Sequence, residues 1–235
     1  ETGLYSFAYN IGMIPVIFLG SFNSAWVPWF YKQLTLGKKS KIRKSVKLYS
    51  SVFLIITIAI IMIGPELAVI LAPENYIEGA KLISVVVLSY FFQFLYTIYV
   101  NFAFYRKKTF MISVGSIMAG GLNVILNLAM IPIFGYEVAA WTTVISYFCL
   151  FIFHWFNVRV LLKEKTVPLK GMMILAIIAS VVTVILYSVS DLYSTFSIVE
   201  RVVRFGVCGL VSSLLIIYVL RIAKKDFGNR LMDGE

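Results

Sequence analysis

The sequence predicts an all-α, polytopic membrane protein, and three observations lead to this fold class. Hydrophobic residues make up 60% of the 235 residues and charged residues only 14%, which leaves more apolar surface than a soluble domain of this length can bury. The apolar residues gather into seven stretches of about 20 residues, the length that an α-helix needs to cross a bilayer. The short segments between these stretches carry most of the 21 Lys and Arg residues.

The seven predicted membrane spans follow one another along the whole chain. Their ranges are 4–30, 48–72, 82–104, 109–131, 138–158, 172–189 and 202–220. Pro15 and Pro28 lie in the first span. We therefore expect this span to be bent, because proline has no backbone N–H and leaves a carbonyl group of the preceding turn without its helical hydrogen bond. Since the chain opens on Glu-Thr-Gly with neither a Met nor a basic flank, we expect it to be a piece of a longer polypeptide.

The turn between the fourth and fifth spans has a readable pattern, IPIFGYE. Pro132 is expected to stop the fourth helix and Gly135 to allow the tight reversal of the chain. Glu137 would then lie near the start of the fifth helix, where a negative charge suits the helix dipole.

The distribution of basic residues predicts how the spans are oriented. The first connection, residues 32–47, holds seven basic residues and no acidic one, and every second connection after it is also basic. Basic connections remain in the cytoplasm, so the N-terminus is expected outside and the C-terminus inside. The net charge of +10 then indicates contact with the anionic lipid of the inner leaflet rather than with nucleic acid.

No pattern in the sequence indicates catalysis, a cofactor or a metal. The chain has one His and two Cys, Cys149 and Cys208, which both lie in apolar spans and form no metal-binding spacing. There is no Gly-rich phosphate loop and no nucleophile elbow. We therefore expect a protein that is not an enzyme and that needs no cofactor.

Polar residues inside the third span are the first candidates for a functional site. At 100° per residue, Tyr90, Gln93, Thr97 and Asn101 fall with other polar residues within an arc of about 140°, opposite an arc of Phe, Leu and Ile. These amide, phenol and hydroxyl groups suit the wall of a wet cavity better than close helix packing. Asn10 and Asn23 in the first span are further candidates for the same cavity.

The polar residues of the fourth and fifth spans have a plainer interpretation. Asn123 and Asn127 continue a line of small and polar residues, which favours helix-to-helix packing. In the fifth span, Thr143, Tyr147 and His154 align within about 40°. His154 is expected to be a buried histidine that faces the bundle with its hydrogen bonds satisfied, and a protonation switch is the alternative.

The segment from residue 123 to 143 also carries a family resemblance. It combines an Asn-x-x-x-Asn pair, an Ile-Pro-x-Phe-Gly turn and the pairs Ala-Ala and Thr-Thr, with Asn123, Asn127, Pro132 and Gly135 as its defining residues. This combination resembles the signature segment in the C-terminal half of bacterial polysaccharide flippases. These are the O-antigen and capsule repeat-unit translocases of the multidrug/oligosaccharidyl-lipid/polysaccharide exporter superfamily.

Further matches extend this resemblance over residues 1–157. They are Gly3-Leu4-Tyr5 opening a helix, Pro28 closing it, Tyr76 with Ala80 before the third span, and Lys107-Lys108-Thr109 before the fourth. The chain departs from the family at Glu137-Val138-Ala139-Ala140, where the family often has Gly-Ala-Ala, so that the Gly is missing.

The resemblance implies that the chain is most of the C-terminal lobe of a two-lobed transporter and lacks its N-terminal lobe. The implied function is to flip undecaprenyl-diphosphate-linked oligosaccharide across the bacterial inner membrane by alternating access. No span carries Lys or Arg near its middle, so cations for the diphosphate would come from the span edges or from the absent lobe. The plainer interpretation of the edge cluster Arg106, Lys107 and Lys108 is a topology anchor.

Two alternatives remain open. A multidrug extruder of the same superfamily is expected to hold an acidic residue within a span, and no span has one at mid-depth. A membrane enzyme of polysaccharide assembly, such as a polymerase or ligase, is expected to have a large outer loop with several Arg or His, and residues 190–201 are too short for that.

Overall fold

The computed structural model describes residues 2–71 and 79–188, together with scattered positions between residues 200 and 221. The regular elements of this part are helices. They are α1 (Thr2–Gly12), α2 (Ile14–Thr35), α3 (Lys39–Leu71), α4 (Lys81–Tyr105), α5 (Phe110–Phe134), α6 (Val138–Phe156), the π-helical segment η2 (Asn157–Leu161) and α7 (Leu169–Ser188).

Six helical segments of the described chain are long and apolar enough to cross a membrane. They are Gly3–Thr35, Lys39–Gly64, Lys81–Tyr105, Phe110–Phe134, Val138–Leu161 and Leu169–Ser188. The first six predicted spans are thus confirmed as apolar helices. The predicted seventh span, 202–220, lies outside the described residues except for scattered positions.

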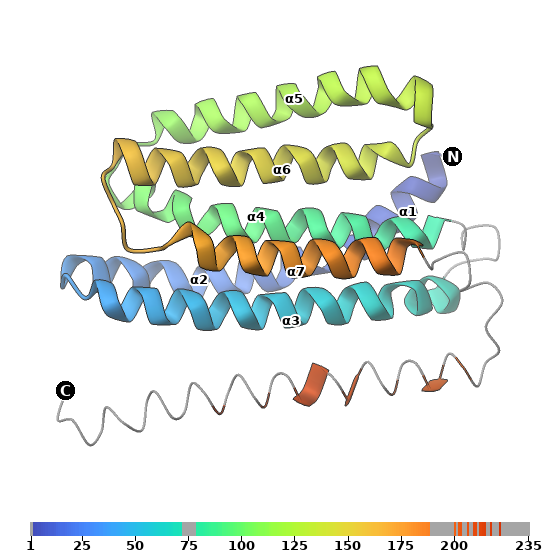
Figure 1. Cartoon of the computed structure of the whole chain (residues 1–235), viewed down its shortest axis with the longest axis horizontal. Coiled ribbons are helices and arrows are strands. Elements are labelled where there is room, and N and C mark those ends of the chain that lie inside the picture. The colour runs from blue at the N-terminus through green and yellow to red at the C-terminus, as the bar shows by residue number, and fades with distance from the viewer. Residues whose placement is uncertain are drawn as a thin grey trace.

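The long helices lie side by side in one bundle, and successive helices run in opposite directions (Figure 1). The turns α2–α3, α4–α5 and α6–α7, which carry most of the basic residues of the described chain, share one end of the bundle. The positive-inside rule predicts that this end faces the cytoplasm, and we call it the basic end.

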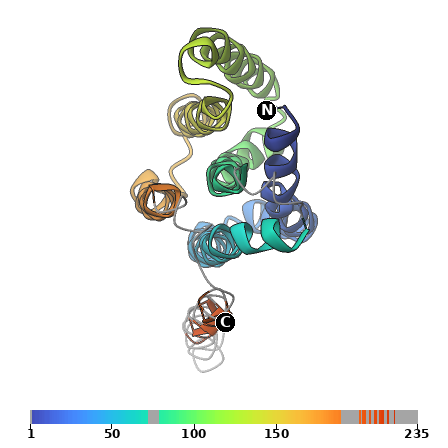
Figure 2. The ribbon, with the colours of Figure 1, turned by 90° about the vertical axis from the view of Figure 1, so that its right-hand side faces the viewer.

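Helix α4 lies inside the bundle, where it packs against α1, α2, α3, α6 and α7. Figure 2 shows this end-on, with α5 at the outer edge beyond α6. Aromatic rings fill the contacts of α4 with α2 and α3. The Phe94 ring stacks on Phe53 with ring centroids 4.1 Å apart, and Phe102 meets Phe30 edge-on at 4.8 Å. These rings supply much of the buried apolar surface that holds the inner helix in place.

The first span is broken rather than merely bent. Helix α1 ends at Gly12 and α2 begins at Ile14, with Met13 between them, and Figure 2 shows α1 inclined to α2. Pro15 explains the break, since its ring would clash with the carbonyl of Ile11 in a continuous helix and it has no amide hydrogen to donate. Pro28, in contrast, is accommodated within α2, which continues to Thr35, so the expectation that Pro28 closes the helix is wrong.

Two predicted loop boundaries are also wrong. Most of residues 32–47 is helical, because α2 extends to Thr35 and α3 begins at Lys39. Ile42 and Val46, one turn apart, are 0% and 2% exposed, so their burial extends the helix into the basic stretch. Pro132 does not stop α5, which runs on to Phe134 and ends at Gly135 with a φ of 79°.

A buried carboxylate joins the three connections at the basic end. Glu164, in the α6–α7 connection, has a side chain that is 4% exposed and accepts hydrogen bonds from the Lys39 ammonium at 3.0 and 3.1 Å. It also accepts one from the Thr166 hydroxyl at 2.6 Å and one from the Lys165 amide at 3.0 Å, and Arg106 lies 3.9 Å away. One side chain thus ties α3, the end of α4 and the start of α7 together.

Candidate polar site inside the bundle

The inner helix α4 is open at only a few positions. From Leu82 to Ala103 every residue is buried except Gln93, Tyr96 and Thr97. All three are polar, and they lie within two turns of one another near the middle of the helix. We call these three partly exposed positions the opening of α4. Positions that faced only lipid would be expected to carry apolar side chains.

The side chains around this opening form a polar cluster contributed by three helices. We define it as Tyr5 and Tyr9 of α1, Tyr90, Gln93 and Tyr96 of α4, and Thr143, Tyr147 and His154 of α6.

The contact between α4 and α6 in the cluster is made by rings. The Tyr96 ring stacks on Tyr147 with centroids 6.3 Å apart and an interplanar angle of 9°, and on His154 at 5.6 Å and 26°. Gln93, one turn before, lies beside the Tyr96 hydroxyl. Tyr147 and His154, which the sequence places on one side of α6, therefore both face α4.

Helix α1 joins the cluster through its tyrosines. The Tyr90 hydroxyl donates a hydrogen bond to the Tyr9 hydroxyl at 2.9 Å. Tyr9 stacks on Tyr5, with centroids 6.0 Å apart, and Tyr5 lies beside Thr143 of α6. Tyr9 was not among the residues predicted from the sequence. Its spacing of four residues from Tyr5 was a usable signal, but the break near Pro15 prevents one helical angle from being carried along the first span.

Several polar atoms in the cluster have no protein partner. Gln93 Oε1 and both ring nitrogens of His154 are buried without a hydrogen bond among the described residues, and His154 is 0% exposed. The expectation that His154 is buried and faces the bundle is confirmed, but the expectation that it is hydrogen-bonded is not. A buried polar group without a partner costs about 1–3 kcal/mol, so these atoms destabilise the folded chain unless a partner reaches them.

The asparagine pair of α5 forms a separate network against α6. Asn127 donates to Asn123 Oδ1 at 3.2 Å and accepts from the Thr142 hydroxyl, while Asn123 Nδ2 lies 3.4 Å from the Thr143 hydroxyl. These bonds join successive turns of α5 to α6, which supports the interpretation that Asn123 and Asn127 serve helix packing. Because Thr143 also lies beside Tyr5, the network adjoins the polar cluster.

Helix α5 approaches α6 closely at one glycine. A Cβ atom at Gly115 would lie 2.8 Å from the Phe153 ring and 3.1 Å from His154 Nε2. Glycine is therefore required where α5 covers His154.

The other predicted cavity residues lie outside the cluster. Thr97 is at the opening, but its hydroxyl bonds back to the Phe94 carbonyl at 2.6 Å. Asn101 is 6% exposed and its Nδ2 has no partner, while Asn23 has a buried Oδ1 without one. Asn10 is exposed. No hydrogen bond or ring contact found in the described residues joins Asn10, Asn23 or Asn101 to the cluster, so their role in a cavity stays a prediction.

The cluster offers hydroxyl, amide and imidazole groups and no formal charge. Among the described residues no three His, Cys, Asp or Glu side chains gather in a way that could hold a metal ion. Such a surface is suited to hydrogen-bonding an uncharged, hydroxyl-rich ligand and to stacking against its apolar faces.

Comparison of the chain with protein-family models, curated proteins and solved structures found no match.

Proposed function

We propose that the chain forms one lobe of a membrane transporter and that the polar cluster lines the path of a hydroxyl-rich solute. The observation that carries this proposal is the opening of α4, where Gln93, Tyr96 and Thr97 are the only residues between Leu82 and Ala103 that are not buried. Polar groups at the middle of a membrane helix are costly in lipid and typically face a bundle interior or a water-filled cavity. We infer a role in transport rather than in catalysis.

The solute that fits best is the sugar head of a lipid-linked oligosaccharide. Tyrosine, glutamine and threonine pair with sugar hydroxyls without placing an unpaired charge in the membrane. The resemblance of residues 123–143 to polysaccharide flippases supports undecaprenyl-diphosphate-linked oligosaccharide as the substrate. It also supports the bacterial inner membrane as the location, with the C-terminus in the cytoplasm, and an N-terminal lobe as the partner that faces the polar cluster.

The second candidate is a multidrug extruder of the same superfamily. The observation that favours it is the number of tyrosine rings in the cluster, since such rings bind organic cations through their faces. None of the six described spans contains Asp or Glu, so this lobe brings no acidic group for coupling to a cation gradient. We therefore place this function second.

Complementation tests the proposal. The full-length gene, which on this proposal also encodes the N-terminal lobe, is expressed in a bacterium that lacks its own polysaccharide flippase and makes a matched repeat unit, and surface polysaccharide is measured. We expect rescue by the wild type and loss of rescue by the double variant Gln93→Leu, Thr97→Val. The control is Ser89→Ala, which changes a buried polar residue of the same helix whose hydroxyl bonds only to the Val86 carbonyl.

Each outcome discriminates. Rescue by the double variant at normal membrane levels would contradict a role of the opening in transport. Failure of the inserted wild type with matched repeat units would contradict the substrate, and drug resistance conferred by that same protein would favour the extruder.

A further inference from the structure

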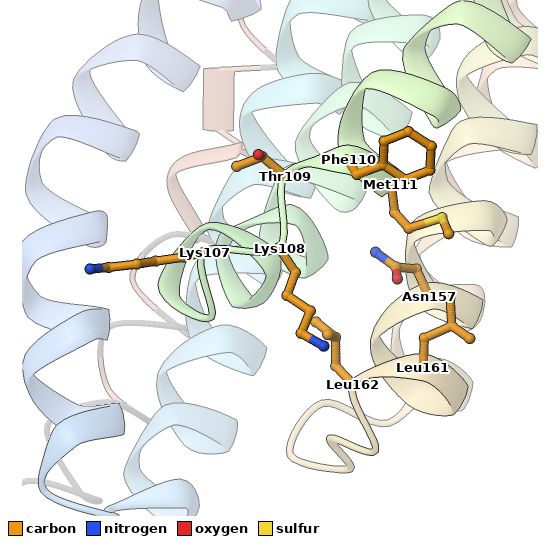
Figure 3. A pocket seen from close by; sticks show the side chains of 8 residues that line it. All are labelled: Lys107, Lys108, Thr109, Phe110, Met111, Asn157, Leu161 and Leu162. Carbon is orange, nitrogen blue, oxygen red and sulfur yellow. The ribbon is translucent and has the colours of Figure 1, made fainter.

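A pocket of about 390 Å³ lies at the basic end of the bundle, and no residue of the polar cluster lines it. Its walls come from the α4–α5 turn, the first residues of α5 and the segment η2. Figure 3 shows Lys108 and the Asn157 amide on facing sides of the pocket, with Phe110 and Met111 above them and Leu161 and Leu162 below.

The upper wall of the pocket is the N-terminus of a long helix. Helix α5 has 25 residues, no acidic residue in its first turn and no side-chain cap on Thr109. The first amides of a helix, here those of Phe110 and Met111, have no acceptor within the helix. Together with the helix dipole, such amides favour an anion.

A buried amide points to a ligand independently of the helix end. Asn157 is 2% exposed, and its Nδ2 has no hydrogen-bond partner among the described residues. It belongs to a π-helical segment, a feature that is rare and frequently found at functional sites. An anion between Asn157 and the α5 amides would give this donor the acceptor that it lacks.

The pocket also has a positive charge and an exposed apolar surface. Lys107 and Lys108 are exposed and make no ion pair within the described chain. Lys107 points away from the pocket in Figure 3, so Lys108 is the lysine that brings charge to it. The nearby carboxylate, Glu164, is already bonded to Lys39. The apolar walls remain open, since Phe110 is 72% exposed and Leu161 52%.

We propose that this pocket binds the phosphate headgroup of a lipid in the adjacent leaflet, with the α5 amides, Lys108 and Asn157 contacting the phosphate. Phe110, Met111 and Leu161 contact the start of the lipid chains. A free anion would leave these apolar side chains uncovered, which is why the ligand is a lipid. The proposal concerns a site outside the polar cluster and does not depend on transport.

Lipid retention by the purified protein tests this proposal. The protein is stripped of lipid in a neutral detergent and mixed with phosphatidylglycerol or with diacylglycerol of the same chains, and bound lipid is measured by native mass spectrometry. We expect the wild type to retain phosphatidylglycerol and not diacylglycerol. Lys108→Gln is expected to weaken retention about fivefold, the effect of one Lys near an anionic membrane surface, and Lys108→Arg to restore it.

Asn157→Asp is the second variant, since it keeps the shape of the side chain and sets a negative charge against the phosphate. It is expected to weaken retention at least as much as Lys108→Gln. The control, Lys170→Gln, removes an exposed charge from the basic end outside the pocket and is expected to retain lipid as the wild type does. Equal loss in Lys170→Gln would overturn the proposal in favour of diffuse attraction, as would unchanged retention in Lys108→Gln.

Competitors identify the source of the phosphate. Displacement of phosphatidylglycerol by undecaprenyl phosphate would support the site and show that a carrier lipid also occupies it, and displacement by a second phospholipid alone would support it as a phospholipid site. Binding of inorganic phosphate with no retained lipid, or equal retention of diacylglycerol, would overturn it.

Discussion

Replacing Glu164 by Gln tests how the basic end of the bundle is held. The substitution keeps the size of the side chain and removes the charge that Lys39, Thr166 and the Lys165 amide share. We expect the helices to remain associated but the free energy of unfolding to fall.

The size of the effect follows from the separate contacts. Hydrogen bonds to a charged group contribute about 1.5–3 kcal/mol each, and neutral ones about 0.5–1.5 kcal/mol. The bonds from Thr166 and Lys165 thus lose about 1 kcal/mol each when the acceptor becomes neutral. The Lys39 side chain is 59% exposed, so its ion pair adds no more than about 1 kcal/mol. The sum for Glu164→Gln is about 2–3 kcal/mol, against about 1 kcal/mol or less for the control Lys39→Met.

The same substitution predicts a change in pH dependence. Burial raises the pKa of the Glu164 carboxyl, but the bonds from Thr166, Lys39 and Lys165 outweigh it and hold the pKa below its ordinary value of 4.5. A carboxyl whose pKa is lower in the folded chain stabilises that chain fully above pH 4.5, and the contribution is lost as pH falls through the folded pKa.

Unfolding of the detergent-solubilised protein, followed by tryptophan fluorescence, measures both effects. The wild type should lose stability below pH 4.5 more steeply than Glu164→Gln. An equal acid dependence of the two proteins, or a cost no larger than that of Lys39→Met, would refute the reasoning.

Two further predictions concern the contact of α5 with α6. Gly115→Leu places side-chain atoms where Phe153 already lies and should lower the free energy of unfolding by about 1–3 kcal/mol, whereas Gly121→Ala, with open space around it, should have little effect; equal effects in denaturant titrations would show that α5 does not pack as described. Asn127→Leu removes bonds with Asn123 and Thr142 and should cost about 1–2 kcal/mol, and a double-mutant cycle with Thr142→Val should show coupling, the absence of which would exclude the bond.

The sequence predicted the apolar helices well because their signal is local. A run of about 20 apolar residues needs no knowledge of its neighbours to be read as a membrane helix. The polar arc of α4 was also readable, since angles along one unbroken helix can be summed. Gln93 and Thr97, two of the residues chosen in this way, lie at the opening of α4.

Contacts between distant segments could not be predicted from the sequence in the same way. Glu164 meets Lys39 across 125 positions of the chain, and Lys81 pairs with Glu137 at 2.7 Å; single charged residues give no sign of such partners. Helix ends were misjudged at Pro28 and Pro132 because proline marks a boundary only when its neighbours cannot accommodate it. The place of Tyr9 in the polar cluster was not predicted, because the break between α1 and α2 prevents one helical angle from being carried along the first span.

Cysteine accessibility at the opening of α4 tests the central claim most directly. Gln93→Cys and Ile125→Cys are made in a chain whose native cysteines are replaced by Ala, since Cys149 is free and exposed. Each variant, in membranes, is treated with a charged thiol reagent, which reacts with the thiolate and therefore requires water. Ile125 is 64% exposed on the outer helix α5 and stands for a position facing lipid. We predict rapid labelling of Gln93→Cys and slow labelling of Ile125→Cys; equally slow labelling of both would contradict a water-filled polar path along α4.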